Sequence, residues 1–90
     1  MEQFTIIEIL DGGVKHIEKD ERFCLACLTD DYERLVIWGS HDNTNNLKAV
    51  SGKQPPFVIE CDFVEPEGRS AEKYGDAYWV GEDDPLSIIE

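Results

Sequence analysis

The sequence has few basic residues and no long apolar run. Eight Lys and Arg residues stand against 20 Asp and Glu residues, so the formal net charge is −12. Duplex DNA and anionic membranes attract proteins largely through Lys and Arg, and this balance argues against both as partners. No apolar run approaches the ~20 residues that span a bilayer. The N-terminus lacks the basic flank and apolar core of a secretory signal. These absences predict a cytoplasmic protein with no membrane partner.

Cysteine is also scarce, with Cys24, Cys27 and Cys61 as the full set. An odd number of cysteines without a secretory signal does not describe a disulfide framework. Cys24 and Cys27 form a CxxC pair, but structural zinc usually needs two such pairs, and only Cys61, His16 and His41 could complete the set. A redox CxxC opens a helix, whereas the flanking residues here have the pattern of a buried strand. We therefore expect core cysteines, with metal and redox chemistry as the alternatives.

Catalytic signatures are missing as well. Neither His16 nor His41 has a sequence neighbour that would orient it as a general base. Gly12-Gly13 is too short for a phosphate-binding loop, and no Lys-Ser/Thr follows it. Among 20 acids, pairs such as Asp30-Asp31 and Glu82-Asp83-Asp84 arise by chance and are typical of solvated turns. The sequence predicts no enzyme, no catalytic residue, no metal and no cofactor.

What is present is the composition of one small globular domain. Apolar residues make up 41% of the 90 residues and charged residues 31%, close to ordinary globular usage. This length predicts a single domain over residues 1–90. The charge is even, because each half of the chain holds ten acids and four bases. It serves either solubility alone or the attraction of basic partners.

The pattern of the chain predicts a mostly β fold. Strands are expected at residues 4–10, 23–29, 33–38, 57–64 and 77–80. The clearest lies at 57–64, where Phe57, Ile59, Cys61 and Phe63 alternate with outward residues. A short helix is expected around Leu47 and Val50, because they are spaced i, i+3 and are followed by Gly52 and Pro55-Pro56.

Two segments allow alternatives. Gly12-Gly13 forms either a hairpin turn or a bulge in one long bent strand that runs on through Ile17, followed by a loop at 18–22. Residues 86–89 form either an edge strand or a short helical turn.

The order of three strands, a short helix and two strands resembles the OB-fold, a small five-stranded Greek-key barrel. An SH3-like barrel and an α+β sheet with one helix are the competing architectures.

Local features resemble bacterial single-stranded-DNA-binding proteins of the OB-fold. They are Phe23-x-Leu25-Ala26, Val36-Ile37-Trp38-Gly39 and Tyr74-Gly75-Asp76-Ala77-Tyr78. The resemblance implies a five-stranded OB-like barrel with a helix between strands three and four, and a face that binds single strands through stacked aromatics. The chain departs from those proteins in being acidic throughout, where they carry basic grooves.

Protein binding is the leading functional prediction. An acidic surface with exposed aromatics suits a basic or nucleic-acid-handling partner, because aromatics anchor interfaces and charge raises the on-rate. One version is mimicry of nucleic acid, with Glu60 and Asp62 on the outward face of a strand, about 6.6 Å apart. Pairing of an exposed strand edge also makes a homodimer possible.

Direct binding of single-stranded nucleic acid is the alternative. Each exposed aromatic side chain can stack on a nucleobase, while basic side chains such as Arg69 contact the phosphate backbone of the strand. The expected contact residues are Trp38, Tyr74, Tyr78, Trp79, Arg69 and Lys73.

Overall fold

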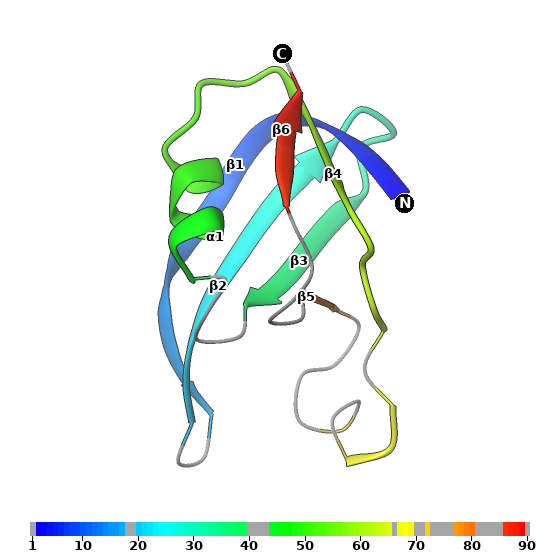
Figure 1. Cartoon of the computed structure of the whole chain (residues 1–90). Coiled ribbons are helices and arrows are strands. Elements are labelled where there is room, and N and C mark those ends of the chain that lie inside the picture. The colour runs from blue at the N-terminus through cyan, green and yellow to red at the C-terminus, as the bar shows by residue number, and fades with distance from the viewer. Residues whose placement is uncertain are drawn as a thin grey trace.

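The fold is a curled six-stranded sheet with one short helix (Figure 1). The computed structural model describes residues 2–17, 20–39, 44–65, 67–69, 72, 77–80 and 86–89. In chain order the elements are β1 (Glu2–Ile17), β2 (Asp20–Thr29), β3 (Arg34–Gly39), α1 (Thr44–Ser51), β4 (Phe57–Cys61), β5 (Tyr78–Val80) and β6 (Ser87–Ile89). The expected mostly β fold, with a helix between the third and fourth strands, is confirmed.

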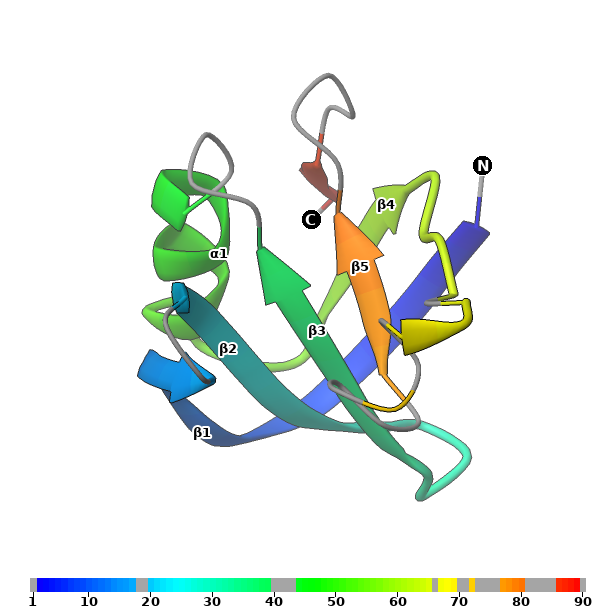
Figure 2. The ribbon, with the colours of Figure 1, turned by 90° about the horizontal axis from the view of Figure 1, so that it is seen from below.

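The sheet curls into a half-barrel (Figure 2). Its strand order is β5-β3-β2-β1-β4-β6, and every pair is antiparallel except β3 with β5, which is parallel. Beyond the end of β4, Val64 forms an antiparallel bridge with Trp79 of β5. Two backbone hydrogen bonds of 3.0 and 2.8 Å make this bridge. The segment after β4 therefore brings the two sides of the sheet toward each other.

The glycine pair lies inside one long strand and is not a turn. Gly12 pairs with Leu25 and Gly13 with Cys24, both in regular register with β2. The irregularities of β1 come earlier, between Ile6 and Glu8 and between Ile9 and Asp11. Of the two alternatives, the long strand through Ile17 is correct, but its bulges precede the glycines.

The loop expected at 18–22 is too long. Arg22 pairs with Lys15 and Glu21 with His16, so β2 already begins at Asp20. The polar composition of the segment hides this pairing, because the two strands extend here as a hairpin arm (Figure 1). Backbone hydrogen bonding across the arm outweighs the low strand propensity of its charged residues.

Helix α1 packs closely against two glycines of the sheet, through Leu47 near its middle and Ser51 at its C-terminal end. A Cβ atom on Gly39 would lie 2.6 Å from Leu47 Cδ1, and one on Gly12 would lie 2.9 Å from Ser51 Cβ. Leu47 and the neighbouring Val50 are fully buried. The absence of a side chain at the two glycines therefore lets α1 cover the barrel and seal its core.

Alternation in β4 is confirmed. Phe57, Ile59, Cys61 and Phe63 are buried and belong to the core. The CxxC cysteines face opposite sides of the sheet, with Cys27 buried and Cys24 half-buried. Two of the three cysteines thus belong to the core, as expected.

The segment expected at residues 86–89 as either an edge strand or a helical turn forms a strand. Residues Ser87–Ile89 form β6, which pairs with β4 at one end of the strand order. The structure thus has six strands where five were expected. Ser87–Ile89 is too short for its hydrophobic periodicity to distinguish a strand from a helical turn. Within the described residues, no helix is long and apolar enough to cross a membrane.

The glycine contact leads to a stability prediction. In Gly12→Ala, the new methyl group would lie 2.9 Å from the Ser51 Cβ. Because both Cβ atoms are attached directly to the main chain, the backbone of β1 or of α1 must move. We expect a loss of about 1–3 kcal/mol, typical of overpacking. Chemical denaturation measures the free energy of unfolding. Gly13→Ala is the matched control, since a Cβ there meets nothing within 4 Å. Equal effects of the two substitutions would contradict the proposed role of the close helix contact.

Candidate functional site

A row of aligned residues crosses the outer face of the sheet. Gly13, Cys24, Trp38 and Trp79 pair in register across β1, β2, β3 and β5. Cys24 and both tryptophans are half-buried. Their sequence neighbours Phe23, Leu25, Ile37 and Val80 are buried in the core. Because alternate residues of a strand face opposite sides, the row points away from the core.

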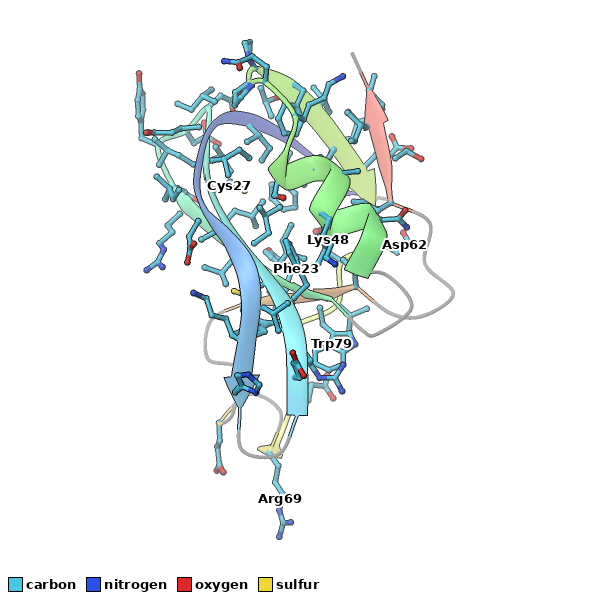
Figure 3. All side chains as sticks on the ribbon, turned by 90° about the vertical axis from the view of Figure 1, so that its left-hand side faces the viewer. Phe23, Cys27, Lys48, Asp62, Arg69 and Trp79 are labelled. Atoms are coloured by element: carbon cyan, nitrogen blue, oxygen red, sulfur yellow. The ribbon has the colours of Figure 1, made fainter. Side chains whose placement is uncertain are left out.

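Arg22 lies over Trp79. The guanidinium carbon is 4.4 Å from the centroid of the Trp79 ring, the geometry of a cation–π contact. The Arg22 Nε atom is buried and has no hydrogen-bond partner among the described residues. Figure 3 shows Trp79 close to β2, between the helix and the lower end of the arm. A guanidinium has five N–H donors, so its terminal groups can donate to an acceptor such as a phosphate while the plane stays stacked on the indole.

Three basic residues lie on this outer face. Lys15 of β1 stands directly opposite Arg22, and Arg34 lies opposite Leu28, further along the sheet. Like charges directly opposite each other in a sheet are destabilising, and a carboxylate offsets the charge of Lys15 here. The Lys15 Nζ atom lies 3.1 Å from a carboxylate oxygen of Asp11. This contact holds the pKa of Asp11 below its usual range.

The Cys24 thiol lies amid these charges. Burial raises its pKa, Lys15 lowers it, Asp11 raises it and Arg34 lowers it, in that order of importance. All three charged side chains therefore act on one point of the outer face. Lys15 and Arg34 oppose Asp11 there. Glu8 also lies on this face, opposite Leu28 and in line with Arg34. The outer face therefore carries both signs of charge around the tryptophan row.

The structure divides the expected contact residues. Trp38 and Trp79 lie side by side on the outer face. Tyr78 faces the other side and packs against Phe4 and Phe63. Arg69 is exposed and lies well apart from Trp79 in Figure 3. The remaining two, Lys73 and Tyr74, lie outside the described residues.

The expected acidic face lies on another part of the sheet. Glu60 is in β4 and accepts a hydrogen bond from the Gln3 side-chain amide of β1. Asp62 is exposed just beyond β4 and lies beside α1, well apart from Arg69, in Figure 3. These two carboxylates are separate from the tryptophan row.

No set of metal ligands comes together in the described part of the chain. There, no group of three or more His, Cys, Asp or Glu side chains is placed to hold an ion. His16 is exposed in β1. His41 and the acidic run at 82–84 lie outside the described residues.

Sequence reasoning missed Lys15, Arg22 and Arg34. Arg22 was placed in a loop, and the other two were not connected with any aromatic residue. A signal exists for two of them, since Arg22 and Arg34 are spaced from Cys24 and Trp38 by even numbers of residues. Even spacing along a strand places side chains on the same face.

Comparison with known proteins gives no match to a family model, a curated protein or a solved structure. The interpretation of the site therefore rests on its own geometry.

Cysteine reactivity tests the two faces of β2. Burial raises the pKa of Cys27 to about 12, and Cys61 is fully buried. Only the half-buried Cys24 thiol should react with a disulfide reagent at pH 8 in the native protein, because the thiolate is the nucleophile. Absorbance of the released thiol should show one equivalent before unfolding and three after. The Cys24→Ser variant should lose the native-state equivalent, and its retention would contradict the assignment of faces.

Proposed function

We propose that the protein is a non-enzymatic binding module, an OB-like barrel whose outer face binds single-stranded nucleic acid. The antiparallel β1–β2–β3 arrangement, the parallel pairing of β3 with β5 and the bridge from Val64 to Trp79 support an OB-like path of the chain. The observation that carries the functional proposal is the Trp38–Trp79 pair with Arg22 stacked on Trp79, and with Lys15 and Arg34 on the same face.

Each part of this face suits a single strand. An unpaired base can stack on an indole or on the guanidinium that covers it, and stacking tolerates any base because every base has a π-face. Lys15 and Arg22 lie opposite each other, and Arg34 lies opposite Leu28, six residues further along β2, so the three cations can contact separate phosphates of one strand. The net charge of −12 repels nucleic acid at long range. Salt screens that repulsion over about 10 Å at 0.1 M, whereas contacts at the face itself persist.

Protein binding, the leading expectation from the sequence, is the second candidate function. The overall charge of −12 favours a basic partner. Mimicry of nucleic acid through Glu60 and Asp62 stays a prediction within this function, as does a homodimer through the edge strand β6. A cytoplasmic location fits either function and is also a prediction.

Oligonucleotide binding tests the outer face. Fluorescence anisotropy of a labelled oligo(dT) should show binding by the wild-type protein at low salt. In Trp79→Ala, loss of one stacking surface should weaken binding roughly 5- to 150-fold, equivalent to about 1–3 kcal/mol. Lys48→Ala is a charge control, because Lys48 is exposed on α1, away from the row (Figure 3). A wild-type protein that does not bind, or a Trp79→Ala variant that binds like the wild type, would overturn the proposal.

Salt dependence tests the three cations. For single strands, the logarithm of the affinity falls with the logarithm of salt concentration by about 0.7 per contacted phosphate, so three contacts predict a slope of about −2. Arg22→Ala should reduce the steepness by about 0.7. Lys48→Ala should leave the slope unchanged. If Arg22→Ala and Lys48→Ala change the slope equally, the effect is one of net charge and Arg22 makes no direct contact.

A further inference from the structure

A second surface lies at one mouth of the half-barrel, where three glutamates surround an aromatic cluster. Glu2 is opposite the buried Cys61, so its side chain belongs to an inward-facing row. Glu33 closes the β2–β3 turn opposite the buried Thr29. Glu65 follows the buried Phe63 by two residues. All three are exposed, so the inward-facing rows of β1, of β3 and of the segment after β4 each end in a carboxylate at the mouth.

The cluster inside this mouth consists of Phe4, Phe63 and Tyr78. Their ring centroids are 5.1, 5.6 and 5.8 Å apart, with the rings tilted or edge-on to one another. Phe63 is nearly buried, whereas Phe4 and Tyr78 are half-buried. The two half-buried rings therefore keep part of their surface accessible to a ligand.

Segments far apart in sequence build the mouth. The backbone amide of Asp30 donates to the carbonyl of Thr5, which ties the β2–β3 turn to β1 beside Phe4. Burial raises the pKa of Tyr78, and the charges of Glu2, Glu65 and Glu33 raise it further, in that order. Among the described residues, the charges that act on this hydroxyl are all negative. The carboxylates and the aromatic cluster thus form one local environment.

This environment suits a cation. Positions that would otherwise continue an apolar row are occupied by carboxylates, and the faces of aromatic rings attract positive charge. A planar guanidinium both stacks on an aromatic ring and forms paired hydrogen bonds with a carboxylate. A nucleic-acid strand, in contrast, would meet three negative charges here.

We propose that this acidic mouth docks a basic segment of a partner protein, with an arginine side chain on the Phe4–Tyr78 surface and its charge among Glu2, Glu33 and Glu65. The surface differs from the outer tryptophan face in position and in the charge of its ligand. The proposal therefore goes beyond nucleic-acid binding and does not depend on it.

Binding of a labelled hexa-arginine peptide at near-physiological salt tests this proposal. The wild-type protein should bind it. Glu65→Gln and Glu33→Gln should each weaken binding about 2- to 30-fold, the range expected for a cation held between a ring and a carboxylate. Glu60→Gln removes the same charge from the outward side of β4, away from the aromatic cluster, and should change affinity less than about 2-fold.

Two substitutions test the role of the Tyr78 ring. Tyr78→Leu should weaken peptide binding to a similar extent, whereas Tyr78→Phe keeps the ring and should preserve it. Circular dichroism checks that both variants fold. If Tyr78→Leu does not fold, Glu33→Gln against Glu60→Gln still decides the proposal. Equal losses in Glu33→Gln, Glu65→Gln and Glu60→Gln, or no peptide binding by the wild type, would overturn it. Trp79→Ala should bind the peptide normally, so failure of the nucleic-acid proposal leaves this result unaffected.

Discussion

Alternation along each strand of the curled sheet determines which side chains enter the core and which remain for a ligand. Ile6, Leu25, Ile37 and Ile59 are fully buried on the inward side, where α1 approaches the glycines closely. The outward positions of the same strands carry the tryptophan row. The glutamates of the acidic mouth lie where inward-facing rows end.

The chain has a large negative net charge but presents two surfaces of different local character. Lys15, Arg22 and Arg34 lie on the outer face with the two tryptophans. The three glutamates of the acidic mouth gather around Tyr78. Long-range steering follows the total charge, whereas affinity depends on contacts at short range. The total of −12 therefore governs which partners approach quickly, and does not decide which surface binds them.

Much of the fold could be predicted from local pattern, and much of the site could not. The alternation at residues 57–64 fixed the inward face of β4, and the Leu47–Val50 spacing found the helix. The neighbourhood of Trp38 and Trp79 depends on a parallel pairing between distant strands, which no local period reveals. Arg22 was hidden because charged residues with low strand propensity still pair when a hairpin extends beyond the barrel.

The central claim is that the outer tryptophan face binds single strands, and the two indole N–H resonances report on it directly. In a ¹H–¹⁵N correlation spectrum, adding oligo(dT) to labelled protein should shift the indole signals of Trp38 and Trp79 together and in proportion to saturation. Substitution of each tryptophan by phenylalanine assigns the two peaks. Indole signals that stay fixed while other resonances shift would place the nucleic acid elsewhere and contradict the account.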